Sequence, residues 1–124
     1  EPNIKEVLQK AEKCDVAILG IGQVSVESTN VKAGALSAKD IEQLKKAGAV
    51  ASVCASYLDA NGRIIENDIT NRSIGVTLDG LKKCKRKIAV AIGNGKVEAI
   101  KAVLFGKHID VLITNIETAT QILA

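Results

Sequence analysis

The chain has 124 residues, of which 47% are hydrophobic and only 2% aromatic, and its formal net charge is +3. This length fits one domain with a single core that buries roughly two thirds of the unfolded surface. Basic and acidic residues are interleaved and few aromatic residues accompany them, which argues against a face that binds nucleic acid. The apolar stretches are too short to span a bilayer, which argues against a membrane protein.

Cys14, Cys54 and Cys84 are far apart in the sequence and include no C-x-x-C pair. This pattern predicts reduced thiols in a cytoplasmic protein, and neither a zinc site nor a disulfide framework. The basic run between Lys82 and Lys87 is typical of a solvated helix end, although it could also touch phosphate. Because the chain contains no Met, we expect it to be a fragment of a longer protein.

The first part of the chain predicts two helices separated by a strand and a loop. Apolar residues at helical spacing predict a helix over the first dozen residues. The apolar run from Val16 to Leu19 predicts a fully buried parallel strand that opens into a glycine turn. After a loop over residues 23–35, the spacing of Ser37 and Asp40 predicts a capping box that begins a second helix.

The middle of the chain predicts a small β excursion. Residues 49–58 read as a strand, residues 59–62 as a turn, and residues 63–69 as a possible returning strand. Residues 74–76 are a short strand candidate. Three apolar residues at helical spacing then predict a short helix: Leu78, Leu81 and Cys84.

The last part alternates between strands and helices. We predict strands over residues 88–92 and 109–113, each followed by a helix, over residues 97–105 and 117–123. Such alternation implies parallel strands joined by right-handed crossovers. The sequence therefore predicts an α/β fold with a mainly parallel, Rossmann-like sheet, flanking helices and a small β excursion in the middle.

Three predicted strand ends are candidates for a ligand site, because loops and helix N-termini meet at the carboxyl edge of a parallel sheet. They are Gly20 to Gly22, Gly93 to Lys96, and Thr114 with Asn115. In the second, glycines let backbone N–H groups approach an anion, the next helix presents its positive end, and Lys96 adds a full charge. A tight strand-to-helix turn with a solvated lysine explains the same residues equally well.

Other motifs are less specific. The string from Gly20 to Gln23 begins like a dinucleotide fingerprint, but its third glycine is missing, so no nucleotide cofactor is expected. Asp59 could bind sugar hydroxyls or simply start a turn. The only histidine, His108, is expected at the surface. Since no catalytic set or metal cluster can be assembled, we expect neither an enzyme nor a metal site.

Six strings stand in a specific order that runs through nearly the whole chain. They are Asp15 to Gly22, Gly48 to Val50, Tyr57 to Gly62, Arg72 to Val76, Ala89 to Gly93 with Lys96, and Asp110 to Thr114. In this order they resemble the C-terminal part of the effector-binding domain of SorC-type transcriptional regulators, a family that binds sugars.

The resemblance implies a fold like that of sugar-phosphate isomerases and CoA transferases, with a phosphorylated sugar bound at the strand ends and not turned over. It implies ligand contacts at five residues: Gly20, Gly22, Gln23, Asp59 and Lys96. The glycine turn adds Gly93, Asn94 and Gly95 to the predicted ligand-binding residues. The resemblance also implies a homo-oligomer that binds operator DNA through a helix-turn-helix domain. Residues 1–124 would be one α/β fragment that lacks this domain and the first part of the effector domain.

Two alternatives remain open. A sugar-phosphate isomerase- or deaminase-like enzyme on the same fold would need a catalytic carboxylate and a base that face Lys96. A ligand-free oligomerisation module is favoured by three departures from the family pattern, Ala51, Ser52 and Ile92.

Overall fold

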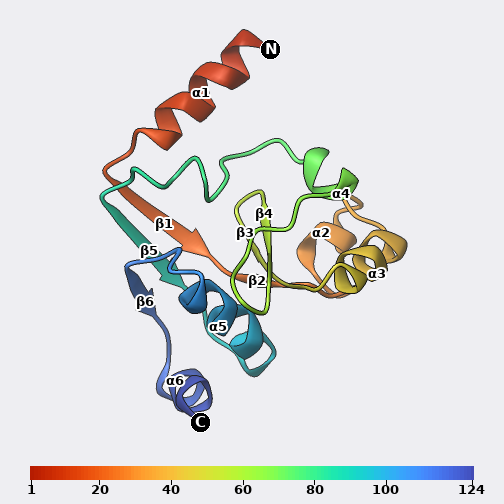
Figure 1. Cartoon of the computed structure of the whole chain (residues 1–124), viewed down its shortest axis with the longest axis vertical. Coiled ribbons are helices and arrows are strands. Elements are labelled where there is room, and N and C mark those ends of the chain that lie inside the picture. Colours follow the sequence, from red (N-terminus) through yellow and green to blue (C-terminus); the bar gives the residue numbers. More distant parts are fainter.

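The computed structural model describes residues 1–124 and contains two three-stranded sheets with helices around them (Figure 1). The helices are α1 (Pro2–Glu12), α2 (Thr29–Lys32), α3 (Ala38–Lys46), α4 (Asp68–Asn71), α5 (Val97–Phe105) and α6 (Ile116–Leu123), with a 3-10 turn, η1 (Asn94–Lys96). The strands are β1 (Val16–Gly20), β2 (Gly22–Gln23), β3 (Ala49–Val53), β4 (Ser56–Asp59), β5 (Arg86–Val90) and β6 (Val111–Ile113). None of the helices has the length and apolar character needed to span a bilayer.

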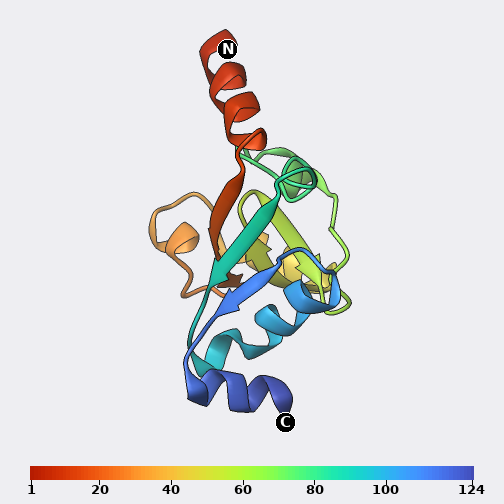
Figure 2. The ribbon, with the colours of Figure 1, turned by 90° about the vertical axis from the view of Figure 1, so that its left-hand side faces the viewer.

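The parallel sheet has the order β1-β5-β6, with Val16 opposite Arg86 and Ile88 opposite Val111. Helix α5 is the crossover from β5 to β6, and the chain continues into α6 after the last strand. The predicted parallel α/β arrangement is therefore confirmed. Helix α1 buries no residue and extends away from the body of the molecule in both views (Figures 1 and 2).

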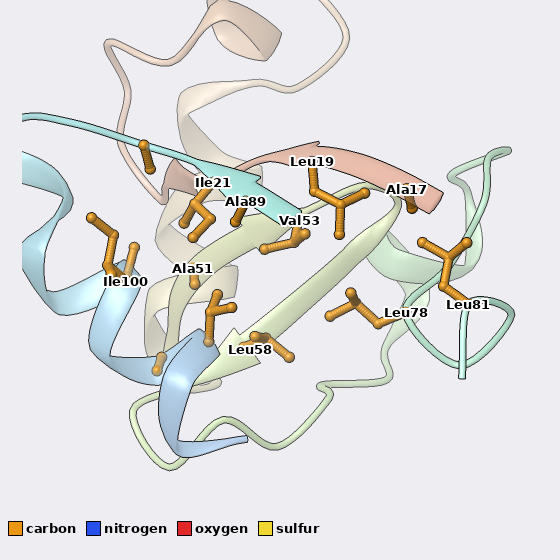
Figure 3. Packing of buried hydrophobic residues seen from close by; sticks show 14 of the residues in the cluster. Ala17, Leu19, Ile21, Ala51, Val53, Leu58, Leu78, Leu81, Ala89 and Ile100 are labelled. Carbon is orange, nitrogen blue, oxygen red and sulfur yellow. The ribbon is translucent and has the colours of Figure 1, made fainter. Parts of the chain in front are cut away.

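The main core lies between the two sheets (Figure 3). Leu19 and Ala89 of the parallel sheet pack in one cluster with Val53 and Leu58 of the antiparallel sheet, and Ile100 of α5 completes it. Tyr57 lies next to Leu58 but faces a second cluster formed with α3 and α4. Because neighbouring residues of a strand point to opposite faces, the antiparallel sheet is covered on both sides.

The predicted capping box is present at the start of α3. The Asp40 N–H donates to Ser37 Oγ at 3.1 Å, and the Ser37 N–H donates to Asp40 Oδ2 at 2.9 Å. These bonds satisfy two of the donors that a helix start leaves without partners. The helix then buries Ile41 and Leu44, so this part of the prediction is confirmed.

Several predictions for the middle of the chain are wrong. Residues 49–58 form two strands, β3 and β4, because Cys54 takes a positive φ of 53° and reverses the chain between them. No strand forms over residues 63–69, where Ile64 makes one bridge to Leu58 and Asn67 caps α4. Residues 74–76 form no strand either, and residues 78–84 form successive turns in place of the predicted helix.

The predicted loop over residues 23–35 also contains regular structure. Gln23 belongs to β2 and lies opposite Ala51, while Thr29–Lys32 forms the short helix α2. These two elements were not expected because neither is long enough to show a period in the sequence.

One face of the parallel sheet is bare. Along β1, Ala17 and Leu19 are buried, whereas Val16 is 52% exposed and Ile18 is 75% exposed. Val90 of β5 and Ile113 of β6 are also about half exposed, at 48% and 52%. The prediction of a fully buried strand is therefore wrong for one of the two faces, where no helix of this chain covers the side chains.

Substitutions at neighbouring residues of β1 should lower the free energy of unfolding by different amounts, depending on the face of the sheet on which each side chain lies. In the isolated chain, Leu19→Ala should lower the free energy of unfolding by about 2–5 kcal/mol, because it leaves a cavity in the core. Ile18→Ala removes a side chain that is already in solvent and should change the free energy by less than about 0.5 kcal/mol. Urea denaturation followed by circular dichroism measures both, and equal costs would contradict the bare face.

Candidate ligand-binding site

The three candidate strand ends lie on one edge of the parallel sheet. Gly20 at the end of β1 is opposite Val90 of β5, which is in turn opposite Ile113 of β6. The Ala91 N–H then donates to the Ile113 carbonyl at 3.1 Å, so β5 and β6 remain side by side up to the turn at Gly93. The expectation that these ends share one edge is confirmed.

The turn at Gly93 is fastened to α6. Gly93 has φ 126° and ψ 146°, and its N–H donates to the hydroxyl oxygen of Thr118 at 3.0 Å. Thr118 is 1% exposed, and its own N–H donates to the Asn115 side chain at 2.9 Å. Gln121 also donates to the Asn94 side chain at 2.8 Å. These bonds hold the glycine turn in one position before any ligand arrives.

The turn after β1 meets the turn after β5 through Gln23 and Gly95. A Cβ built on Gly95 would lie 2.7 Å from Gln23 Oε1, which shows how closely this side chain covers the glycine. Gln23 is held there because β2 pairs with β3, with Gly22 opposite Ser52. Two parts of the predicted site, separated by about seventy residues of sequence, are thus in contact.

A pocket of about 450 Å³ opens beside this contact. It lies between β2, the end of α3, the start of β3 and the first turn of α5. Its lining consists of Gln23, Val24, Ser25, Lys45, Gly48, Ala49, Val50, Gly95, Glu98 and Ala99. The pocket has one cation, one carboxylate and two neutral polar side chains, which is a lining that suits a small polar ligand.

Three polar residues of this pocket were missed from the sequence: Ser25, Lys45 and Glu98. Lys45 stands in the last turn of α3 and Glu98 in the first turn of α5, where a basic and an acidic residue respectively are ordinary features of helix ends. Only the packing of α3 and α5 around β3 brings them together. No local signal in the sequence could have identified them.

Lys96 and Asn94 lie in η1, next to the pocket and outside its lining. Lys96 is half-buried and makes no ion pair with another side chain. Its charge is therefore not neutralised within the chain. Gly95 lines the pocket, and Lys96 is the next residue along the same turn.

Asp59 lies apart from the strand-end cluster, at the end of β4. Its Oδ1 accepts the N–H groups of Asn61 and Arg63, both at 2.9 Å, so its role in starting the turn is confirmed. The residue does not line the 450 Å³ pocket. A contact between Asp59 and sugar hydroxyls stays a prediction.

His108 is half-buried, which differs from the expected surface position. Its Nε2 donates to the Gly62 carbonyl at 2.6 Å, so Nε2 carries the proton because a carbonyl can only accept. The bond joins the end of α5 to the turn after β4. Gly62 has a φ of 80°, and a Cβ there would collide with the backbone of Gly106. The histidine therefore has a structural partner at the edge of the sheet opposite the predicted site.

Two other pockets are present. One of about 130 Å³ is lined by Gly22 and Gln23 among others and contains the buried Ser28 hydroxyl, which has no hydrogen-bond partner. The largest, of about 540 Å³, is mainly apolar, and its one charged residue is Arg72. Arg72 donates to Asp40 Oδ1 at 2.8 Å, and the Ser37 N–H together with Arg72 lowers the pKa of Asp40. With its cation already paired, this larger pocket is less suited to an anion than the pocket at Lys45.

The family of the chain follows from comparison with known proteins. The family model described as "Putative sugar-binding domain" matches residues 1–124. The chain belongs to this family of sugar-binding domains. It is 34% identical over its whole length to the transcriptional regulator LsrR of Klebsiella pneumoniae, of which it covers 39%. It is 33% identical over 94% of its length to the deoxyribonucleoside regulator of Bacillus subtilis, of which it covers 37%.

Solved structures of transcriptional regulators share the fold. A DeoR family transcriptional regulator from Listeria monocytogenes has a TM-score of 0.92 and 30% identity, over 98% of this chain and 49% of that one. A structure described as "Putative Sugar-Binding Domain of Transcriptional Repressor", from Vibrio fischeri, has a TM-score of 0.89 and 27% identity, over 99% of this chain and 49% of that one. The chain therefore spans less than half the length of these relatives.

The positive φ of Gly93 gives a test of the site's local structure. A φ of 126° with ψ of 146° is open almost only to glycine, so Gly93→Ala should lower the free energy of unfolding by about 1–3 kcal/mol. Gly20→Ala is the matched control, because its Cβ would meet nothing within 4 Å, and it should cost less than about 0.5 kcal/mol. Denaturant titration measures both, and a neutral Gly93→Ala would contradict the turn.

Proposed function

We propose that this domain takes part in binding a phosphorylated sugar that serves as the effector of a transcriptional regulator. The observation that carries the proposal is the contact between Gln23 and Gly95 beside a polar pocket, at the carboxyl edge of a parallel sheet. Membership of the sugar-binding family supports the sugar part of the ligand. The phosphate part rests on the charges around the pocket.

Two lysines supply those charges. Lys45 lines the pocket, and Lys96 follows Gly95 in the adjoining turn without an ion pair of its own. A phosphate forms charge-assisted hydrogen bonds with such ammonium groups, and these are roughly twice as strong as bonds between neutral groups. The first turn of α5 adds the partial positive charge of a helix N-terminus.

The neutral part of the ligand would face different groups. Gln23, Ser25 and Glu98 line the same pocket and offer an amide, a hydroxyl and a carboxylate. These groups can donate to or accept from sugar hydroxyls, and their placement would select among sugars. Gly20 and Gly22 do not line this pocket, and in this proposal the lack of a side chain at either position leaves room for the ligand beside Gln23.

We further propose that the longer protein is a homo-oligomer that acts in the cytoplasm and binds operator DNA through a domain outside residues 1–124. In this proposal the present chain is the C-terminal part of the effector-binding domain. The ligand would bind one of two conformations more tightly and so shift the affinity for operator DNA, with no chemical turnover. The relatives named as transcriptional regulators are consistent with a role other than catalysis.

The binding proposal is tested by calorimetry on the full-length protein with a panel of sugar phosphates. Lys96→Ala should weaken binding of the recognised compound by about tenfold or more, because a hydrogen bond to a charged group contributes about 1.5–3 kcal/mol. Lys39→Ala is the matched control: it removes the same charge from an exposed position of α3 that has no ion pair.

Three outcomes would contradict the proposal. Absence of saturable binding across the whole panel would favour a ligand-free oligomerisation module. If Lys96→Ala and Lys39→Ala weakened ligand binding equally, the glycine turn would not be part of the binding site. Consumption of the bound compound in a turnover assay would instead favour an enzyme.

A further inference from the structure

Cys14 and Cys84 are 70 residues apart in the sequence, but their Sγ atoms lie 3.6 Å apart. The pairing of β1 with β5 explains this contact. Val16 lies opposite Arg86, and each cysteine precedes its strand residue by two positions. The Arg86 N–H also donates to the Asp15 carbonyl at 3.1 Å, so the two segments already run side by side before the strands begin.

The two thiols differ in their access to solvent. Cys84 is 5% exposed, belongs to the main core, and its thiol donates to the Arg86 carbonyl at 3.4 Å. Cys14 is only half-buried, in the short junction between α1 and β1. A small molecule can therefore reach Cys14 first, with Cys84 directly behind it.

Neither the third cysteine nor a metal-binding cluster offers these two thiols a different partner. The third cysteine, Cys54, is exposed in the hairpin between β3 and β4. The structure contains no group of three or more His, Cys, Asp and Glu side chains placed to hold a metal ion. The remaining chemistry of two adjacent thiols is their oxidation to a disulfide.

We propose that Cys14 and Cys84 form a reversible disulfide, with a low-molecular-weight disulfide such as oxidised glutathione as the oxidant. The Cys14 thiolate attacks one sulfur of the oxidant, breaks its S–S bond and releases one glutathione thiolate. The Cys84 thiolate then attacks the Cys14 sulfur and releases the second. Two electrons pass to the oxidant, and the two protons lost by the cysteines end on the two glutathione thiols.

The closure requires only a small movement. The sulfur atoms must approach from 3.6 Å to about 2.05 Å, and the hydrogen bond from the Arg86 N–H to the Asp15 carbonyl already holds the two segments together beside the cysteines. Because Cys14 lies between α1 and β1, the bond would tie that junction to the segment that leads into β5. It would also close a loop of 70 residues in the unfolded chain.

The pH should control the rate of bridge formation. Burial, and then the neighbouring Cys84 thiol, raise the pKa of Cys14, so the protonated form predominates at neutral pH. Since the thiolate is the attacking form, the rate should rise by roughly tenfold per pH unit below that raised pKa.

The purified chain is equilibrated with defined ratios of reduced and oxidised glutathione, quenched with acid, alkylated and analysed by mass spectrometry. We expect a species that carries two fewer alkyl groups than the reduced chain, with peptides joined through Cys14 and Cys84. Its unfolding temperature should exceed that of the reduced chain by on the order of 10 °C, because the bridge restricts the unfolded state.

Cys54→Ser is the matched control, and it should form the bridge as readily as the unmodified chain. Cys14→Ser and Cys84→Ser should each abolish the joined peptide. The proposal is overturned if the folded Cys54→Ser variant forms no bridge under fully oxidised glutathione, or if the bridge in the unmodified chain includes Cys54. Bridge formation in the Cys54→Ser variant is measured with both Cys14 and Cys84 present. A folding defect in the Cys14→Ser or Cys84→Ser variant therefore does not affect this measurement.

Discussion

Helix α5 joins the two sheets into one body, and the geometry of the candidate site depends on it. Its residues Ile100 and Val103 are fully buried and pack in the same cluster as Leu58 and Ala89, one from each sheet. The glycine turn and Lys96 precede its first turn, while its last turn leads to the His108 contact with the hairpin after β4. The same packing that stabilises the core therefore also sets the position of the glycine turn in the candidate site.

Parts of this arrangement could be predicted from the sequence because their signals are local. The Ser37 and Asp40 spacing specifies a helix start by hydrogen bonds between near neighbours, and the apolar run after Asp15 specifies a strand. The strand ends could be placed on one edge because parallel strands share their direction. These rules need no knowledge of how distant segments pack.

The remaining features depend on tertiary packing. The hairpin at Cys54 needs a positive φ in a residue that rarely adopts one, so this turn has no signal in the sequence. Lys45 reaches the pocket only because α3 packs against the antiparallel sheet. The bare side of the parallel sheet was missed because a continuous apolar run is equally compatible with one covered face or two.

The bare face of the parallel sheet also affects how copies of this chain associate with one another. Strand β1 stands at the edge of the parallel sheet, and its outward residues Val16 and Ile18 are apolar and exposed. An unpaired strand edge beside an apolar surface is a template on which another strand can add by main-chain hydrogen bonds. Residues 1–124 in isolation are thus exposed to strand-by-strand aggregation along β1, and a charged side chain at position 18 would act as a gatekeeper against it.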